Sequence, residues 1–168
     1  KRVARIVLSG KTHHESGEYV KKFENEFAKY IETKYALATT SGTSALQIAM
    51  SGLGLAPGDE VIIPAYTFIA VAQAVLSVGA IPIFADIDDT YNLSPDAVEK
   101  SITRRTKAII VVHMFGNVAK IGDICKLASE KNIKVIEDCA QAIGAEYCGR
   151  KVGSIGNVGC FSFNIKKQ

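Results

Sequence analysis

The sequence predicts an α/β fold with three layers, in which helices cover both faces of a mostly parallel sheet. Short apolar segments alternate with longer segments of helical periodicity along the whole 168-residue chain. This alternation is typical of βαβ units, whose crossover helices join parallel strands. The segment 108–112 consists almost entirely of β-branched residues, as a strand buried on both faces requires. We therefore predict one α/β domain over residues 1–168.

The length and composition fit an ordinary soluble protein with one sizeable core. Hydrophobic residues make up 48% of the chain, charged residues make up 22%, and the net charge is +3. The basic residues are dispersed among acids, so the sequence indicates no nucleic-acid partner. It contains neither an apolar segment of about 18 residues for a transmembrane helix nor a secretion signal. We expect a cytoplasmic protein without a membrane partner.

The candidate metal ligands of the sequence do not form a convincing metal site. His13, His14 and Glu15 are adjacent, so their side chains point apart, which favours a solvated or substrate-edge loop. The cysteines lack C-x-x-C spacing and have apolar neighbours, which favours reduced, mostly buried thiols. They are Cys125, Cys139, Cys148 and Cys160.

Apolar periodicity and turn residues define the elements of the first half of the chain. Apolar residues recur every three or four positions from Tyr19 to Ile31, which predicts an amphipathic helix. Pro64 stops a buried strand, and Gly79 ends the helix that follows it. The predicted elements are a helix over 19–31, a strand over 35–39, a helix over 43–50, a strand over 60–63 and a helix over 68–78.

The second half of the chain continues the alternation. Ser94, Pro95 and Asp96 start a helix, because they supply an N-cap, a proline at the first helical position and an acid near the positive end of the dipole. The other predicted elements are strands over 81–85, 108–112, 134–138 and 158–162 and a helix over 121–131. The carboxyl ends of such strands form the edge of the sheet where α/β proteins bind ligands.

Two adjacent acids, Glu137 and Asp138, end the strand over 134–138, and the amide Gln141 follows three positions later. Strand alternation directs the two acids to opposite faces, and we expect Glu137 to be structural. Asp138 is a candidate ligand-binding acid at the strand end. A metal site, a helix cap or an ion pair with an arginine would also place an acid there.

The segment Ser41-Gly42-Thr43-Ser44 joins a predicted strand to a helix. Gly42 permits a tight turn, and the amides of Thr43 and Ser44 would point outward at the positive end of the helix, beside their own hydroxyls. These residues could bind a phosphate, although simple helix capping would explain them as well. The segment is neither a Walker loop nor a dinucleotide fingerprint.

Further side chains with suitable chemistry follow other strand ends. Phe68 could stack on a planar ligand or belong to the core. Ser162 offers a hydroxyl, and Lys167 follows it by five residues, with Lys166 as a competitor. Tyr66 and His113 rank below these candidates. An anion site, an aromatic face, an acid, an amide and a lysine are together the groups that pyridoxal 5'-phosphate requires.

Seven segments, in a fixed order, carry a family resemblance. They are F-E-N-E-F-A-K-Y-I, S-G-T-S-A-L, G-D-E-V-I-I-P-A-Y-T-F, G-A-I-P-I-F-A-D-I-D, V-V-H-M-F-G, V-I-E-D-C-A-Q-A-I-G-A and G-S-I-G-N-V-G-C-F-S-F. Through them, nearly the whole chain resembles the DegT/DnrJ/EryC1/StrS family of sugar aminotransferases, which are fold type I pyridoxal-phosphate enzymes. Each segment is weak alone, but their order is specific.

The resemblance implies roles for individual residues. Asp138 matches the acid that pairs with the pyridine nitrogen of the cofactor, and Gln141 matches the amide near its phenolic oxygen. Phe68 matches the aromatic residue stacked on the ring, and Lys167 matches the Schiff-base lysine, where dehydratase members carry His. The residues that match phosphate-binding positions are Thr43, Ser44 and Ser162.

The same resemblance implies an activity and partners. Members transfer an amino group from glutamate or glutamine to a nucleotide-linked keto-sugar, as homodimers with a shared active site. A keto-cyclitol substrate and a non-catalytic binding or regulatory homologue are the alternatives. Family members continue well beyond the position of Gln168 into a small C-terminal domain. We therefore expect this chain to match the N-terminal part of the family and to be inactive by itself.

Overall fold

The computed structural model describes residues 2–10 and 18–165 of the chain. By its internal contacts the chain divides into two compact units, Lys1–Ala38 and Thr39–Gln168. Each unit is described by itself. All residues predicted to belong to the functional site fall within the sequence of the second unit.

The first unit contains two helices, α1 (Arg2–Leu8) and α2 (Glu18–Ile31). α2 confirms the helix predicted over 19–31, and the ring centroids of Phe23 and Phe27 lie 5.6 Å apart on it. The strand predicted over 35–39 is wrong, because this segment is irregular. The Ala38 amide donates to a carboxylate oxygen of Glu24 at 2.8 Å instead of joining a strand ladder.

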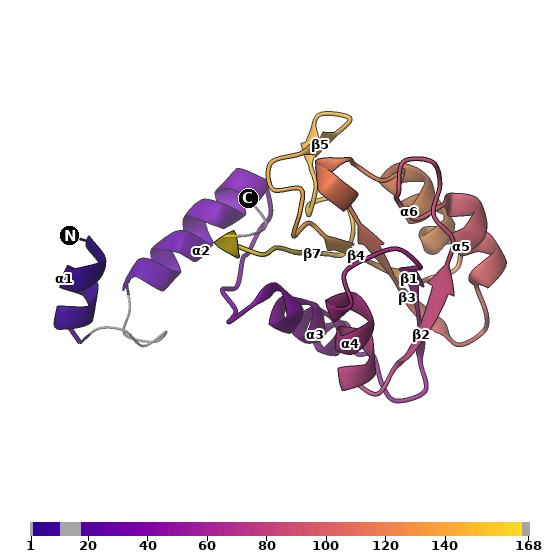
Figure 1. The fold of residues 1–168 in the computed structure, drawn as a ribbon, viewed down its shortest axis with the longest axis horizontal. Coiled ribbons are helices and arrows are strands. Elements are labelled where there is room, and N and C mark those ends of the chain that lie inside the picture. Colours follow the sequence, from indigo (N-terminus) through magenta and orange to yellow (C-terminus); the bar gives the residue numbers. More distant parts are fainter. Residues whose placement is uncertain (1, 11–17, 166–168) are drawn as a thin grey trace. The chain divides into compact units, whose positions relative to one another are not determined.

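The second unit is built on a five-stranded parallel sheet with the strand order β2-β1-β3-β4-β7 (Figure 1). Two pairings, that of β3 with β4 and that of β4 with the edge strand β7, bring the strand ends into line: Val112 of β3 is the register partner of Asp138 of β4, which in turn pairs with Cys160 of β7. The strands are β1 (Glu60–Pro64), β2 (Ile81–Ala85), β3 (Thr106–Val112), β4 (Lys134–Asp138) and β7 (Val158–Cys160).

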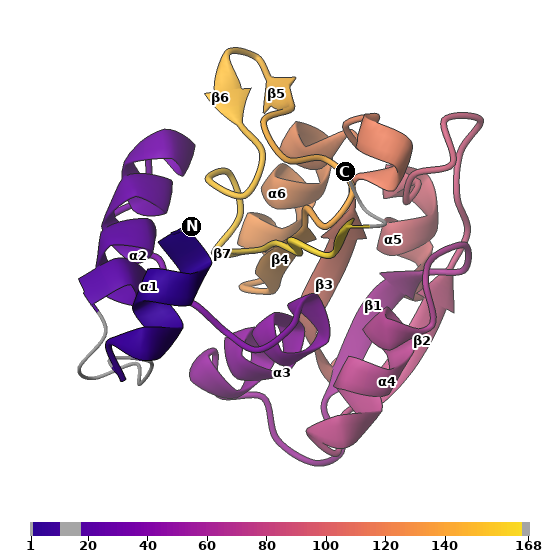
Figure 2. The ribbon, with the colours of Figure 1, turned by 60° about the vertical axis from the view of Figure 1, so that its left-hand side comes forward.

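Helices cover both faces of this sheet, which confirms the three-layer α/β prediction (Figure 2). α3 (Gly42–Gly52) and α4 (Ala70–Ser77) pack on one face, and α5 (Pro95–Ser101) and α6 (Ile121–Glu130) pack on the other. Alternate residues of the central strands therefore enter two separate apolar cores. A 3₁₀ turn, η1 (Met114–Gly116), follows β3, and a small hairpin, β5 (Glu146–Tyr147) with β6 (Arg150–Lys151), follows β4.

Two element boundaries differ from the prediction at positions that matter for the site. α4 begins at Ala70, so Phe68 lies in the turn before the helix, and its carbonyl accepts from the Val71 amide at 3.1 Å. β7 ends at Cys160, because its partner strand β4 ends at Asp138 in the same register. Ser162 therefore lies beyond the ladder, at the carboxyl edge of the sheet.

The four cysteines are all free, as predicted. Cys139 and Cys160 are buried, Cys125 is half-buried and Cys148 is exposed. Burial, followed by the charge of Asp138, raises the pKa of Cys160 to about 12. This thiol is therefore protonated and unreactive at neutral pH. Over residues 2–10 and 18–165, no helix has the length and apolar character needed to cross a membrane.

The packing of β7 depends on a backbone contact that only glycine permits. A Cβ atom on Gly159 would lie 2.5 Å from both Cα and the carbonyl oxygen of Gly153, which are backbone atoms that cannot rotate away. We expect Gly159→Ala to lower the free energy of unfolding of the intact protein by about 3 kcal/mol or more. Gly52→Ala is the control, because a Cβ atom at that end of α3 meets nothing within 4 Å. Urea unfolding measures both variants, and equal stabilities would contradict the close approach.

Candidate active site

The carboxyl edge of the parallel sheet gathers the predicted site residues on neighbouring loops. Asp138 ends β4 and is 8% exposed. Its Oδ1 accepts from the Ala140 amide at 3.0 Å, which fixes the carboxylate at the start of the following turn. Because Asp138 pairs in register with Cys160, Ser162 lies only two residues past the neighbouring position on β7. The structure thus places Asp138 and Ser162 on adjacent strand ends.

The N-terminus of α3 forms the second part of the site. Ser41 is the N-cap, and its Oγ accepts from the Ser44 amide at 3.1 Å, so the capping interpretation of this segment is correct. The Ser44 hydroxyl also lies 3.0 Å from the hydroxyls of Thr40 and Ser41. Helix geometry leaves the amides of Gly42 and Thr43 without intrahelical acceptors. Capping and anion binding are compatible here, because two amides and several hydroxyls remain available at the positive end of the dipole.

Ser162 lies directly against this helix N-terminus. A Cβ atom on Gly42 would be 3.0 Å from Ser162 Cβ and 3.3 Å from the carbonyl oxygen of Phe161. Only glycine allows so close an approach without displacing the strand end. The structure therefore brings together the phosphate-binding candidates Thr43, Ser44 and Ser162, which lie far apart in the sequence.

Gln141 connects the loop after β4 to the turn after β3. Its Oε1 accepts from the Phe115 amide at 3.2 Å. Phe115 has φ +55° and ψ +24°, a left-handed conformation that is unfavourable for a residue with a bulky side chain. The hydrogen bond to Gln141 helps to hold this conformation, which the sequence had not revealed.

Exposed aromatic side chains from three loops meet at the same edge of the sheet. Tyr66 follows β1, Tyr91 follows β2 and Phe115 follows β3, with exposed fractions of 47%, 55% and 67%. Their ring centroids are 5.7 to 6.4 Å apart, which is the range of favourable aromatic contact. Phe68, the predicted stacking residue, is 58% exposed in the turn before α4. We call Tyr66, Tyr91 and Phe115 the aromatic cluster.

A buried amide holds two loops of this aromatic cluster together. Asn92 is 1% exposed, and its Oδ1 accepts from the Met114 amide at 2.9 Å. Its Nδ2 donates to the carbonyl of Asn117 at 3.2 Å. Tyr91, the neighbour of Asn92, has φ +62°, so two of the three clustered residues adopt left-handed backbone conformations. A sequence search for polar site residues does not detect this arrangement, because its signals are an asparagine in a loop and backbone angles.

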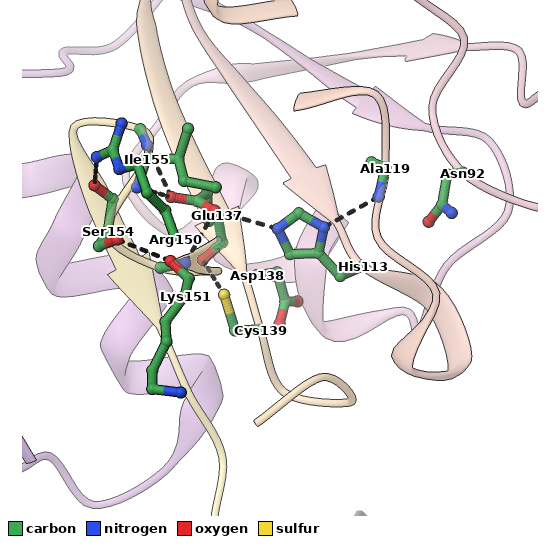
Figure 3. Close-up of polar contacts among 12 residues, drawn as sticks. Asn92, His113, Ala119, Glu137, Asp138, Cys139, Arg150, Lys151, Ser154 and Ile155 are labelled. Atoms are coloured by element: carbon green, nitrogen blue, oxygen red, sulfur yellow. Dashed lines mark hydrogen bonds and ion pairs between the residues drawn. The ribbon is translucent and has the colours of Figure 1, made fainter. Parts of the chain in front are cut away.

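Glu137 is structural, as strand alternation predicted, and Figure 3 shows its contacts. The side chain is fully buried, and its two oxygens accept from the amides of Gly153, Ile155 and Gly156 at 2.7 to 2.8 Å. It also lies 3.2 Å from Nε2 of the buried His113. Burial alone raises the pKa of Glu137, but these hydrogen bonds more than offset it and hold the pKa below its usual value.

The same neighbourhood has the composition of a metal site. Ligand atoms of His113, Glu137 and Cys139 lie within 4.8 Å of one another. Both Glu137 oxygens, however, already accept N–H hydrogen bonds, and His113 Nδ1 accepts from the Ala119 amide at 3.2 Å. The thiol of Cys139 is protonated, because burial, and then the charge of Glu137, raises its pKa. The donor set therefore fits a hydrogen-bonded anchor and not a cation.

Several predicted residues lie outside the described part of the chain. They are Lys166, Lys167, His13, His14 and Glu15. Two observations indicate that the described residues fit pyridoxal 5'-phosphate, the cofactor that the sequence predicts. The close approach of Gly42 to Ser162 brings a hydroxyl to the N-terminus of α3, which is an arrangement suited to an anion, and Asp138 supplies a buried acid on the adjacent strand. Gln141 adds an amide in the loop that follows Asp138.

Comparisons with known proteins identify relatives of the chain. Residues 1–168 match the model of the DegT/DnrJ/EryC1/StrS aminotransferase family. GDP-perosamine synthase of Escherichia coli O157:H7 is 45% identical, over 88% of this chain and 41% of that protein. L-glutamine:2-deoxy-scyllo-inosose aminotransferase of Streptomyces kanamyceticus is 47% identical, over 88% and 35%. The crystal structure of NtdA from Bacillus subtilis with bound cofactor PMP has a TM-score of 0.83 and 40% identity, over 88% and 34%.

The chain is similar to these proteins in both sequence and fold. The parallel sheet with helices on both faces is the architecture of the fold type I aminotransferases to which the chain is similar. The chain spans 41% and 35% of the two curated relatives, so it corresponds to about two fifths of their length. The family model nevertheless covers every residue from 1 to 168, and on this match the chain belongs to the DegT/DnrJ/EryC1/StrS aminotransferase family.

Proposed function

We propose that the intact protein is a pyridoxal-phosphate-dependent aminotransferase that moves an amino group from glutamate or glutamine to a nucleotide-linked keto-sugar. The observation that carries the proposal is the approach of Gly42 to Ser162 at the strand end next to Asp138. It supports a phosphate site beside a buried acid at one edge of the sheet. The relatives support the reaction class, since the name of the Streptomyces relative describes an aminotransferase and one solved structure holds PMP.

In this proposal, each predicted residue binds a different part of the cofactor. The hydroxyls of Thr43, Ser44 and Ser162, with the amides of Gly42 and Thr43, bind its phosphate. Asp138 pairs with the ring nitrogen, and the Gln141 amide lies by the phenolic oxygen. Phe68 stacks on the ring, and Lys167 holds the cofactor covalently through Nζ.

The proposed reaction requires a proton to be removed from a carbon atom of the donor and a proton to be added to a carbon atom of the acceptor. Residues of this chain perform both transfers. When bound, pyridoxal phosphate supplies an electron sink for the pair left behind when that proton departs. Asp138 keeps a negative charge beside the ring nitrogen and so holds a proton there. Lys167 Nζ removes a proton from the α-carbon of the amino donor and returns one when the keto acceptor is aminated. The burial of Asp138 keeps competing water away from its carboxylate.

The acceptor is proposed to be a nucleotide-linked keto-sugar, bound by a homodimer with a shared site. The name of the Escherichia coli relative, GDP-perosamine synthase, describes a nucleotide-linked amino sugar. The aromatic cluster supports this choice, because its exposed rings offer a surface for stacking on a base or a sugar ring. The second candidate is a keto-cyclitol, which the name of the Streptomyces relative describes.

The identity of the covalent lysine can be tested by absorption spectroscopy. We expect the intact protein to show a visible band with added pyridoxal phosphate and Lys167→Ala to lose it, because an alanine cannot form the covalent bond. Lys166→Ala is the matched control and should keep the band. If Lys166→Ala loses the band and Lys167→Ala retains it, the lysine assignment is wrong.

The role of Asp138 predicts a separation between binding and turnover. We expect Asp138→Asn to bind the cofactor but to lower kcat by at least about 100-fold, because a neutral amide no longer stabilises the ring proton. Asp59→Asn is the control: Asp59 also accepts one backbone amide, that of Ala56 at 2.9 Å, but it precedes β1 at the opposite edge of the sheet. Near-normal turnover of Asp138→Asn would remove the proposed role.

The choice of acceptor can be tested by competition between two substrates. With glutamate or glutamine as donor, we expect kcat/KM to be at least about 100-fold higher for a nucleoside-diphosphate keto-sugar than for a free keto-cyclitol. The nucleotide gives the protein binding energy remote from the reacting carbon, which the cyclitol lacks. The reverse preference would favour the cyclitol reaction, and no turnover of either substrate would favour a non-catalytic homologue.

A further inference from the structure

The carboxylate of Glu137 joins three segments of the sheet edge. It accepts from the Gly153 amide and His113 on Oε2, and from the Ile155 and Gly156 amides on Oε1. His113 follows β3, Glu137 lies in β4, and the 153–156 segment precedes β7. One buried side chain therefore binds the regions flanking both neighbouring strands, as Figure 3 shows.

The hydrogen bonds of His113 determine where its proton lies. Nδ1 accepts from the Ala119 amide at 3.2 Å, so this nitrogen carries a lone pair and not a proton. Nε2 then carries the only ring proton and donates it to Glu137 at 3.2 Å. The pair consists of a neutral imidazole and an ionised carboxylate. The opposite tautomer would place two N–H groups face to face at Ala119.

The three segments joined by Glu137 are also those that carry the proposed cofactor residues. The turn between His113 and Ala119 includes Phe115, whose amide donates to Gln141. Asp138 follows Glu137 directly, so any shift of the Glu137 backbone moves it. The 153–156 segment leads through β7 to Ser162, and Gly153 lies against Gly159 within that strand.

We propose that Glu137 and His113 form a positioning pair that sets the relative places of Asp138, Gln141 and Ser162. The pair touches neither cofactor nor substrate, and it acts through the backbone of the segments it joins. This inference rests on the proposed function only for the roles of those three residues. The hydrogen-bonded arrangement itself does not depend on it.

The substitution Glu137→Gln tests the pair because it keeps shape and changes hydrogen bonding. Four N–H donors converge on the two oxygens, but a glutamine side chain has one oxygen and one NH₂ group. Because each oxygen accepts from two donors, two of the four must then face the NH₂ group. A tautomer change at His113 would only transfer this conflict to Ala119, so a segment of the sheet edge has to shift.

Glu60→Gln is a matched control on the opposite edge of the sheet. Glu60 is a second buried acid, with 2% exposure, at the amino end of β1. Its carboxylate accepts from the Thr103 hydroxyl and pairs with Arg105 at 2.5 Å. Its loss should destabilise the fold without moving the segments that follow β3, β4 and β7.

The first measurement uses the intact protein without cofactor. We expect Glu137→Gln to speed amide hydrogen exchange at least about tenfold in peptides covering 113–119 and 153–162. Glu60→Gln should leave exchange in these two peptides unchanged and raise it around 60 and 103–106. Equal exchange patterns in the two variants would overturn the positioning role.

The second measurement uses the protein loaded with pyridoxal phosphate. We expect Glu137→Gln to shift the pH titration of the visible band by at least about half a unit, because the distance of Asp138 from the ring changes. It should lower kcat about tenfold or more, with less than about a threefold change in KM. Glu60→Gln should reproduce the unsubstituted titration and kcat. A titration of Glu137→Gln that matches this control would overturn the proposal.

Two further variants cover the case in which Glu137→Gln does not fold. His113→Gln retains an N–H near Nε2 that can donate to Glu137, whereas His113→Leu removes it. The glutamine variant should therefore lie closer to the unsubstituted protein in exchange and in the band titration. Identical behaviour of the two variants would contradict the proposal. If Asp138→Asn leaves the titration unchanged, the proposed cofactor role fails, and the exchange data decide the positioning role alone.

A stability measurement checks the ionisation of Glu137. Because its pKa is lowered in the folded protein, its stabilisation is complete above the usual value of 4.5 and is lost as the pH falls below it. The difference in unfolding free energy between the unsubstituted protein and Glu137→Gln should therefore narrow below about pH 4.5. The other titratable groups facing Glu137 are His113 and the thiols of Cys125 and Cys139, and burial raises the pKa of both thiols. A constant difference from neutral to acidic pH would mean that the pKa of Glu137 is not lowered by folding, and a difference that widens toward acidic pH would mean that its pKa is raised.

Discussion

Convergence of four N–H groups on the Glu137 carboxylate is the interaction on which the geometry of the sheet edge depends. A buried charge without compensation would be strongly destabilising. Among the residues that the structure describes, three backbone amides and a neutral imidazole compensate it. Because three of the four donors are backbone amides, satisfying the charge also fixes the chain. These hydrogen bonds fix the positions of the residue after β3, of the end of β4 and of the segment that leads into β7.

The loops at the carboxyl edge of the sheet differ from the buried surroundings of Glu137, because they expose aromatic rings and contain strained backbone conformations. Loops after β1, β2 and β3 expose aromatic rings, and two of these loops contain left-handed residues, Tyr91 and Phe115. Such conformations persist only where surrounding contacts over-determine them, and Asn92 and Gln141 provide those contacts. The sheet edge thus has aromatic rings on strained loops and polar groups at the N-terminus of α3. This combination suits a ligand that has both a phosphate and a planar ring.

Membership of the family is consistent with a cofactor site in this part of the chain and with substrate contacts made elsewhere. The names of the two curated relatives describe different compounds, GDP-perosamine in one and 2-deoxy-scyllo-inosose in the other, yet these relatives share 45% and 47% identity with this chain. In this chain, the proposed cofactor site combines the N-terminus of α3, an acid at the end of β4 and a sheet edge that Glu137 holds. Specificity for one acceptor requires contacts made further from the reacting carbon.

The sequence by itself determined the α/β class and most of the elements, because periodicity and turn chemistry are local properties. It also predicted Asp138 and the candidate phosphate residues, whose roles are proposals. It also separated Glu137 from Asp138, since strand alternation follows from the backbone alone. Only the tertiary structure decided that 35–39 is not a strand, that Ser162 lies against Gly42, that Gln141 holds Phe115, and that Glu137 takes its hydrogen bonds from the 153–156 segment. Those relations join residues far apart in the chain, and they depend on strand register and close backbone approach, which no local pattern encodes.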